Sequence, residues 1–245
     1  KQNFRILMLS NLLLLSSSRY RATGFLVDAR PAIYDFLSDV PGEVVFIPYA
    51  NAAQDYDDYE ARVVAALASP SLKIRSIHHA CDPVAVIENA QAIAVGGGNT
   101  FALLARMQQA KIMESIRKAV NSGKPYVGWS AGSNLACPTI CTTNDMPVCQ
   151  PENFDALGLI PFQINPHFVS GQIDGQNGES REQRLTEFLA FHPKKKVLAL
   201  PEGTALIKQG GALTLKGQSD GILFSEQEQQ AIIRGQDLSW MLANT

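Results

Sequence analysis

The stretch Pro125-Tyr126-Val127-Gly128-Trp129-Ser130-Ala131-Gly132 decides the fold of this 245-residue chain. Its apolar first part predicts a buried strand, and the Gly-x-Ser-x-Gly sequence that follows predicts a sharp turn into a helix. Glycine has no Cβ atom, so the flanking glycines permit a turn that lifts the serine hydroxyl into the open. Ser130 is therefore a candidate nucleophile, which requires a base, a group that orients the base, and donors for an oxyanion.

On both sides of that stretch, short apolar runs alternate with longer amphipathic segments. This alternation predicts an α/β fold with an open, mostly parallel sheet and helices on both faces. After residue 200, short segments separated by Gly-Gly or polar turns predict a C-terminal antiparallel meander. The chain has no internal repeat and no linker, so we expect a single α/β domain over residues 1–245. The predicted sheet strands are 6–9, 44–47, 92–95, 126–128 and 197–200, the predicted helices are 32–38, 56–68, 83–90, 101–109 and 112–120, and the meander segments are 204–208, 212–216, 221–224 and 231–234.

Charge and apolar length limit the classes of partner. The charged fraction is 18% and the formal net charge is −2, with no block of like charge. We therefore expect no nucleic acid and no membrane as partner, and a small substrate is favoured. No apolar stretch reaches the roughly 20 residues of a membrane-spanning helix. Asn11 interrupts the apolar run near the start and no small-residue cleavage site follows, so that run predicts a buried strand rather than a secretory signal.

The cysteines and histidines carry no recognisable metal pattern. No two of the four cysteines have Cys-x-x-Cys spacing, and only four histidines are present. We therefore expect no metal and no cofactor, and reduced, buried thiols in a cytoplasmic protein. His78, His79 and His192 are interpreted as surface residues, because no serine turn or other catalytic segment adjoins them.

Three more polar segments follow apolar runs, which are 92–95, Phe162-Gln163-Ile164 and 197–200. The polar segments are Gly96-Gly97-Gly98-Asn99-Thr100, Pro166-His167 and Pro201-Glu202-Gly203. Ligands of open α/β sheets bind beyond the carboxyl ends of the strands, so these segments and Ser130 are predicted to meet at one edge of one sheet. There His167 is the candidate base and Glu202 the candidate orienting carboxylate. The backbone N–H groups of Gly98 and Ala131 are the candidate oxyanion donors.

Each of these motifs has a competing interpretation. A dinucleotide site would explain the triple glycine, but its Gly-x-Gly-x-x-Gly pattern requires glycine where Phe101 stands. Ser130 can occupy an ordinary glycine-rich turn, His167 can be a hydrogen-bonded structural histidine, and Glu202 can be a solvated turn carboxylate. The predicted convergence in the order Ser, His, acid favours catalysis, although α/β-hydrolases use a different order.

Taken together, the motifs resemble those of the bacterial peptidase E family of α-aspartyl dipeptidases. The resemblance runs from Leu9-Ser10-Asn11 to Pro201-Glu202-Gly203 and includes residues 128–139, 142–147, 165–168 and 178–181. It implies a cytoplasmic serine dipeptidase with a class I glutamine-amidotransferase-like fold that cleaves small peptides with an N-terminal aspartate. It also implies that Ser130 is the nucleophile, His167 the base and Glu202 the third member of the triad.

An aspartyl dipeptidase needs two groups that recognise charges on its substrate, one for the aspartate carboxylate and one for the free α-amino group. Arg181 is the candidate for the aspartate side chain, because guanidinium binds carboxylate in a bidentate manner. Asp145 is the candidate for the free amino group, and Asn99 beside the triple glycine completes the expected substrate-binding set. The structural alternatives remain open: Arg181 can be a solvated first-turn residue after a Ser180 cap, and Asp145 can simply brace its loop.

Two other functions compete with the dipeptidase. A cyanophycinase-like exopeptidase would use the same serine motif, and a catalytically inactive amidotransferase-like module would use none of it. A cysteine-based amidotransferase is disfavoured because Ser130 occupies the position of the nucleophile. No motif in the sequence specifies an oligomeric state.

Overall fold

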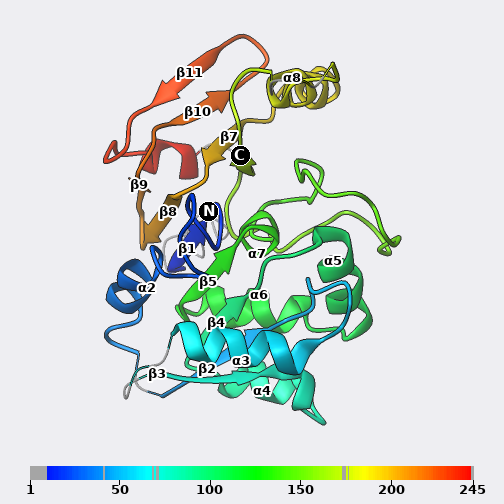
Figure 1. The fold of residues 1–245 in the computed structure, drawn as a ribbon, viewed down its shortest axis with the longest axis vertical. Coiled ribbons are helices and arrows are strands. Elements are labelled where there is room, and N and C mark those ends of the chain that lie inside the picture. Colours follow the sequence, from blue (N-terminus) through cyan, green and yellow to red (C-terminus); the bar gives the residue numbers. More distant parts are fainter. Residues whose placement is uncertain are drawn as a thin grey trace.

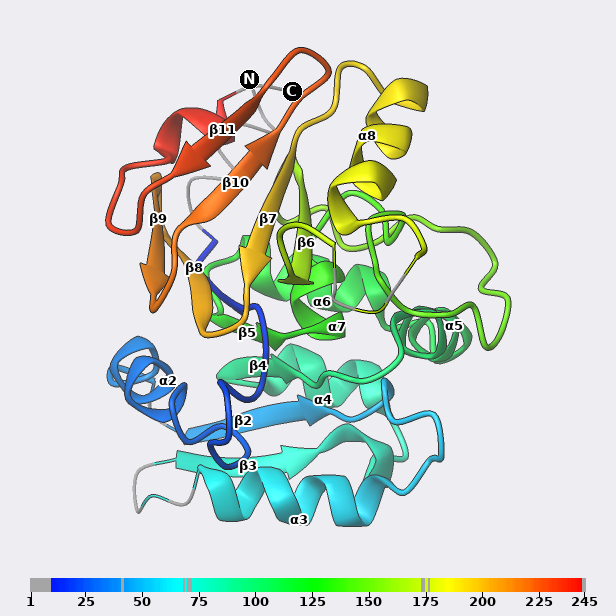
Figure 2. The same ribbon diagram turned by 45° about the horizontal axis from the view of Figure 1, so that its top comes forward.

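The larger of two sheets forms the centre of the molecule (Figures 1 and 2). The computed structural model describes residues 10–40, 42–67, 69, 72–172, 175 and 177–243. This sheet has seven strands in the order β3-β2-β4-β5-β1-β8-β9, of which the first five are parallel. β8 pairs antiparallel with β1, and β9 antiparallel with β8. The strands are β1 (Leu12–Leu15), β2 (Gly42–Ile47), β3 (Leu72–Ser76), β4 (Ala92–Val95), β5 (Tyr126–Trp129), β8 (Thr204–Gln209) and β9 (Ala212–Gly217).

Helices cover both faces of this sheet because alternate strand residues point to opposite sides. Leu12 and Leu14 pack in a core with helices α4 to α7, whereas Leu13 and Leu15 pack in a second core with α2 and α3. Both faces of β1, β2, β4 and β5 are therefore largely apolar, which explains their continuous apolar runs. The helices are α2 (Arg30–Phe36), α3 (Tyr56–Ala66), α4 (Pro83–Asn89), α5 (Thr100–Gln109), α6 (Met113–Asn121) and α7 (Ala131–Asn134), with a 3₁₀ turn η1 (Ile77–His79) after β3.

A second sheet lies beside the first, at the top of Figure 2, and has the order β11-β10-β7-β6. β6 and β7 are parallel, and β10 and β11 add antiparallel strands. Helix α8 (Arg181–Phe191) packs on this sheet through Leu185 and Leu189, which share a small core with Phe168 and Phe224. The other elements are β6 (Gln163–Phe168), β7 (Val197–Pro201), β10 (Gly221–Phe224), β11 (Gln229–Ile232) and a 3₁₀ turn η2 (Ser239–Leu242).

The α/β class, the mostly parallel sheet and the helices on both faces are as predicted. The predicted first strand, 6–9, lies outside the described residues, and β1 begins at Leu12. The strand predicted at 197–200 is real but belongs to the second sheet, and the terminal meander is divided: β8 and β9 join the first sheet, β10 and β11 the second. The expectation that the thiols are buried is wrong for all except Cys137.

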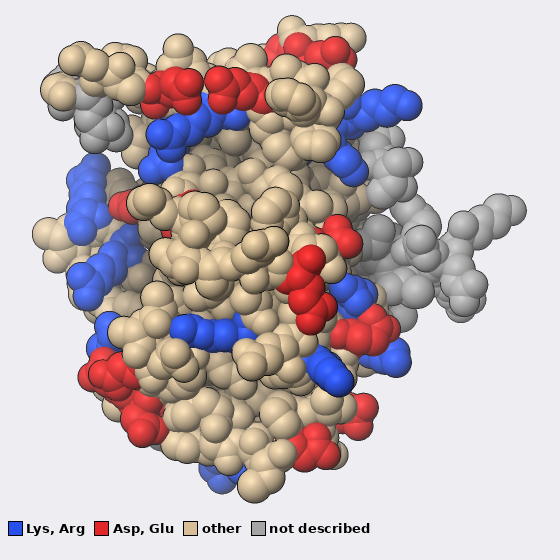
Figure 3. Space-filling view, turned by 90° about the vertical axis from the view of Figure 1, so that its right-hand side faces the viewer, with Lys and Arg blue, Asp and Glu red and all other residues tan. Residues whose placement is uncertain are grey.

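On the face drawn in Figure 3, basic and acidic side chains are interspersed. Among the described residues, no helix has the length and apolar character needed to cross a bilayer.

Candidate active site

Ser130 occupies a strained turn between β5 and α7. Its φ of 54° and ψ of −113° lie outside the regions that non-glycine residues prefer. The turn brings α7 against the neighbouring strand, since a Cβ atom on Gly132 would lie 2.1 Å from the carbonyl oxygen of Val95. The Ser130 N–H donates to the carbonyl oxygen of Leu15 at 3.1 Å, which ties the turn to the end of β1. The Gly-x-Ser-x-Gly sequence thus forms the sharp strand-to-helix turn that its glycines predict.

Ser130, His167 and Glu202 form a continuous hydrogen-bonded chain. Ser130 Oγ lies 2.8 Å from His167 Nε2, and His167 Nδ1 lies 2.7 Å from Glu202 Oε1. Since a carboxylate only accepts, Nδ1 carries the proton and Nε2 is left to accept from the serine hydroxyl. The side chains of His167 and Glu202 are partly exposed to solvent, by 38% and 48% respectively. This is the geometry in which a histidine can take a proton from a serine.

His167 reaches Ser130 because its strand is irregular at that point. The β6–β7 register shifts between Pro166 and Phe168, and His167 has a φ of 55°. The histidine backbone N–H donates to Ser16 Oγ at 2.9 Å instead of to a neighbouring strand. The bulge redirects the imidazole out of the ladder, as bulges beside functional sites commonly do.

Ser16 joins the two sheets beneath the histidine. It directly follows β1 and is completely buried. Its Oγ donates to the carbonyl oxygen of Leu200 in β7 at 2.7 Å while accepting from the N–H of His167, and its own N–H donates to Thr204 in β8 at 2.9 Å. One hydroxyl therefore fixes the strand ends that carry His167 and Glu202 relative to the sheet that carries Ser130.

The glycine-rich loop after β4 lies against the serine turn. Gly98 has a φ of 138°, and a Cβ atom there would lie 2.3 Å from the carbonyl oxygen of Ala50, so this position requires glycine. Among the described residues, the N–H groups of Gly98 and Ala131 have no protein acceptor, which leaves both available as donors. Tyr59 holds the loop by donating to the carbonyl oxygen of Gly97 at 2.9 Å while accepting from Trp129 Nε1 at 3.0 Å. Burial raises the pKa of the Tyr59 hydroxyl to about 12, so it stays a donor at neutral pH.

Hollows open on two sides of Ser130. The larger has a volume of about 430 Å³ and is lined by the serine turn, the glycine loop and basic side chains, among them Arg19 and Arg62. The smaller lies between Ser130, His167 and Asp145. A substrate whose scissile carbonyl lies at Ser130 can therefore extend in both directions.

Asp145 lines the smaller hollow, and one of its oxygens is held in place. Its Oδ2 accepts from the backbone N–H of Thr100 at 2.7 Å, from the hydroxyl of Thr100 at 2.5 Å and from Thr143 at 3.2 Å. No described residue donates to Oδ1. The carboxylate both braces its loop, as the structural alternative supposed, and keeps an oxygen free for a cation.

Arg181 begins α8, where Ser180 caps the helix as expected and forms a capping box with Gln183. Its Nη1 is buried and has no hydrogen-bond partner among the described residues. Burial, and secondarily the charge of Arg184, lowers the pKa of the guanidinium, while Asp145 acts in the opposite direction. Arg181 lines a small pocket of its own with Arg184 rather than either hollow at Ser130. It is thus a partly buried cation with an unused donor, near enough to Asp145 to sense its charge.

Asn99 lies at the edge of the larger hollow, but its side chain is engaged at both ends. Its Oδ1 accepts from the N–H of Ala102 and caps α5, and its Nδ2 donates to the carbonyl oxygen of Met146. The visible role of Asn99 is to hold the glycine loop and the 145–146 loop together.

The structure brings Ser130, His167, Glu202 and the two candidate oxyanion amides together. They do not share one edge of one sheet: Ser130 follows β5 of the seven-stranded sheet, whereas His167 and Glu202 belong to strand ends of the second sheet. Sequence reasoning also missed Ser16 and Tyr59. A search for polar residues after the apolar run Leu12–Leu15 would have found Ser16, because that run is the true first strand of the described chain.

The known proteins that this chain resembles are peptidases. A family model described as Peptidase family S51 matches residues 12–216. The chain is 51% identical to peptidase E of Pasteurella multocida (strain Pm70) over 92% of this chain and 97% of that protein. It is 50% identical to peptidase E of Actinobacillus pleuropneumoniae serotype 5b (strain L20), over 90% and 95%.

Solved structures agree on the fold. A candidate peptidase E from Listeria monocytogenes EGD-e has a TM-score of 0.65 at 26% identity, with 86% of this chain and 99% of that chain covered. A peptidase from an acI-B1 actinobacterium has a TM-score of 0.69 at 16% identity, with 96% and 99% covered, and supports the fold alone. With the family match over most of its length and relatives at about half identity, the chain belongs to peptidase family S51 and is a peptidase that acts on peptide substrates.

Proposed function

We propose that this peptidase is a serine dipeptidase that hydrolyses Asp-X dipeptides through Ser130, His167 and Glu202. The observation that carries the proposal is the hydrogen-bonded chain from Ser130 Oγ to His167 Nε2 at 2.8 Å and from His167 Nδ1 to Glu202 Oε1 at 2.7 Å. Ser130 lies on a strained turn, and backbone strain of this kind is frequent at active sites. Relatives at about 50% identity carry the name peptidase E.

The chemistry proceeds through an acyl-enzyme. His167 Nε2 takes the proton of Ser130 as Oγ attacks the scissile carbonyl carbon, and Glu202 stabilises the imidazolium that forms. The imidazolium then protonates the leaving amine as the C–N bond breaks. A water molecule gives its proton to His167, attacks the ester and releases aspartate while Ser130 regains its proton. These steps need no cofactor.

The oxyanion of each tetrahedral intermediate is bound by the N–H groups of Gly98 and Ala131. Both donors are backbone groups without another acceptor in the described part of the chain, and Tyr59 fixes the loop that carries the first of them. Donors held in place before the reaction need no reorganisation when the charge develops.

Specificity for an N-terminal aspartate rests on Asp145 and Arg181. Asp145 Oδ1 receives the free α-ammonium group in the smaller hollow beside Ser130, because a carboxylate there attracts a cation and leaves no room for a longer N-terminal chain. Arg181 lines a separate small pocket, so it can use its unpartnered Nη1 for the substrate carboxylate when the aspartate side chain reaches beyond the smaller hollow toward α8. Asn99, with both ends of its amide engaged, shapes the site rather than contacting the substrate.

We place the enzyme in the cytoplasm with small peptides as partners. The four cysteines are free thiols, as a reducing compartment maintains them.

The test is the preference for Asp-Leu over Asn-Leu in the Arg181→Met variant. In the natural enzyme, Asp-Leu should have the higher kcat/KM by roughly 10²-fold or more, since an amide leaves a buried guanidinium without its ionic partner. Arg181→Met should erase most of that preference by lowering kcat/KM for Asp-Leu. Arg184→Met removes the same charge one turn along α8 and serves as the matched control that keeps the preference.

A fluorophosphonate probe separates loss of recognition from misfolding. Ser130 should remain fully reactive in Arg181→Met. If Arg181→Met keeps the full preference for Asp-Leu, Arg181 does not read the substrate carboxylate. Faster cleavage of β-Asp-Arg than of Asp-Leu by the natural enzyme would replace the dipeptidase with a cyanophycinase-like exopeptidase.

A further inference from the structure

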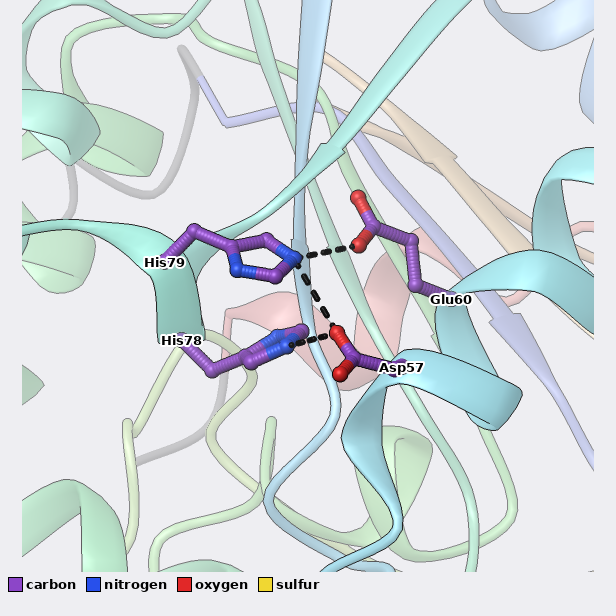
Figure 4. Close-up of side chains that lie close together, drawn as sticks. All are labelled: Asp57, Glu60, His78 and His79. Atoms are coloured by element: carbon purple, nitrogen blue, oxygen red, sulfur yellow. Dashed lines mark hydrogen bonds and ion pairs between the residues drawn. The ribbon is translucent and has the colours of Figure 1, made fainter.

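Four potential metal ligands meet on the side of the larger sheet that α3 covers (Figure 4). Asp57 and Glu60 stand three residues apart on α3 and so point from the same face of the helix. His78 and His79 come from η1, directly after β3. Their nearest ligand atoms all lie within 4.8 Å of one another. The sequence shows no metal spacing because the two pairs are separated by a strand and a loop, and only the fold unites them.

Three of the distances between ligand atoms are close to those around a small cation, and the remaining pairs lie within 4.8 Å of one another. His78 Nε2 lies 3.0 Å from Asp57 Oδ1, His79 Nε2 lies 3.3 Å from the same oxygen, and His79 Nε2 lies 3.0 Å from Glu60 Oε2. Ligand atoms about 2.0–2.2 Å from a tetrahedral ion stand roughly 3.3–3.6 Å apart. The three close pairs need to separate by a few tenths of an ångström to reach that spacing, and any wider pair needs to close toward it.

Neighbouring groups hold two of the ligands in the required orientation. Ser76 Oγ lies 2.6 Å from His78 Nδ1, so the other ring nitrogen faces the cluster. The backbone N–H of Ser76 donates to Glu60 Oε1 at 2.6 Å, which leaves Oε2 directed at His79. Outer partners of this kind fix the tautomer and the direction of metal-binding histidines. The His78 ring also packs against Tyr56, with 5.4 Å between ring centroids.

We propose that Asp57, Glu60, His78 and His79 bind one zinc ion that has a structural role. Two imidazole nitrogens favour zinc over calcium or magnesium, which prefer all-oxygen ligands. Four protein ligands close a tetrahedral shell and leave no open position for catalysis, so the ion takes no part in the hydrolysis.

The ion would clamp the first half of α3 to the end of β3. The same helix carries Tyr59, which holds the glycine loop, and Arg62, which lines the larger hollow. None of the four zinc ligands lines that hollow or the smaller one. The site therefore acts on the stability of the scaffold rather than on the reacting groups.

The test is zinc binding by the whole chain, measured without substrate and so independent of the proposed function. Protein stripped with EDTA is loaded with zinc and passed through a desalting column, and bound metal is measured by mass spectrometry. We expect one zinc ion per chain, and no retained magnesium or calcium. Asp57→Asn and His79→Gln should each weaken zinc affinity roughly tenfold or more, as measured against a chromophoric chelator.

Matched variants locate the ion. Asp58→Asn alters the neighbouring carboxylate in the same first turn of α3, and His192→Gln removes a histidine at the end of α8; both should bind zinc within about threefold of the natural chain. The proposal is overturned if the natural chain retains no zinc, or if Asp57→Asn and His79→Gln bind it normally. It is also overturned if the ion is lost in His167→Gln, because that result places zinc at the serine.

A thermal measurement tests the structural role. Zinc at about 100 times its dissociation constant should raise Tm by roughly 5–10 °C in the natural chain and leave Asp57→Asn unchanged. EDTA should cancel the rise and leave kcat for Asp-Leu at 25 °C unaltered. Loss of kcat in EDTA that zinc restores would show that the ion is not merely structural.

Discussion

Ser130 and His167 share a feature that sequence patterns do not display: both have a positive φ, 54° and 55°, although neither is glycine. Each such conformation costs about 1–3 kcal/mol and persists only where surrounding contacts enforce it. For Ser130 these contacts are the helix–strand approach at Gly132, and for His167 the strand bulge and the hydroxyl of Ser16. The backbone strain thus lies in the two residues whose side chains must exchange a proton.

Ser16→Ala tests whether that hydroxyl positions His167. The change leaves the N–H of His167 and the carbonyl oxygen of Leu200 buried without partners. We expect kcat for Asp-Leu to fall roughly 10- to 100-fold with little change in KM, because a small displacement of the base is costly whereas the binding groups stay in place. Ser17→Ala, which removes the neighbouring hydroxyl, is the control and should keep kcat. Equal kcat values in the two variants would remove Ser16 from the account.

Glu202→Gln tests the orienting carboxylate. An amide oxygen can still accept from Nδ1, but it does not stabilise the imidazolium and it permits the wrong tautomer. We expect kcat to fall roughly 10²- to 10⁴-fold, less than for loss of the nucleophile. Thermal unfolding should be nearly unchanged, since the side chain is 48% exposed. A variant with normal kcat would show that the 2.7 Å contact has no catalytic part.

At the scale of elements, the contact between β4 and α7 sets the position of the serine turn. A Cβ atom on Gly132 would collide with the backbone of Val95, and backbone cannot move aside as a flexible side chain can. Gly132→Ala should therefore lower the free energy of unfolding by roughly 1–3 kcal/mol, measured by urea denaturation. Gly178→Ala is the control, because a Cβ atom there meets nothing within 4 Å. Equal urea midpoints for the two variants would contradict the close approach.

Strongly periodic elements could be predicted from the sequence, and elements defined by tertiary contacts could not. The helix at Tyr56–Ala66 and the strand at Ala92–Val95 follow from local pattern and were found within two residues. β3, with its alternating exposed and buried residues, was not predicted, since Leu72–Ser76 carries two basic residues and little apolar content. The strand at Leu12–Leu15 was not among the predicted strands, and this omission hid Ser16.

For the candidate site, the serine turn and its partners were visible as motifs that follow apolar strands. The division between two sheets was not visible, because periodicity reports that a strand is buried and not which neighbour it pairs with. The metal cluster was invisible for a related reason: its two halves are contiguous only in space.

At the scale of the whole molecule, the reactive groups lie where two sheets meet, and a lysine is buried in β8 of the larger sheet. Lys208 in β8 is 1% exposed, and its Nζ donates to the carbonyl oxygen of Ser10, to Ser10 Oγ and to the carbonyl oxygen of Gly210 at 2.7–2.9 Å. Burial lowers the pKa of this ammonium group from 10.5 to about 8.

The shift of Lys208 predicts how stability changes with pH. Between about pH 8 and 10.5 the unfolded chain binds more protons at this residue than the folded chain does, so the free energy of unfolding rises with pH in that window. Relative to Lys208→Met, the natural chain should gain at most about 1.4 kcal/mol per pH unit there and nothing below it. Urea denaturation at pH 7, 8, 9 and 10 gives the difference. Parallel curves for the two proteins would mean that the ammonium group keeps its ordinary pKa.

The central claim is that Ser130, activated by His167, is the nucleophile, and kcat for Asp-Leu in Ser130→Ala tests it most directly. Removing the nucleophile of a serine triad disables the whole unit, so we predict a fall of roughly 10⁶-fold, and His167→Ala should match it within about tenfold. Circular dichroism and the urea midpoint of Ser130→Ala should equal those of the natural chain, which assigns the loss to chemistry. A folded Ser130→Ala variant that retains kcat within tenfold of the natural enzyme would contradict the serine mechanism.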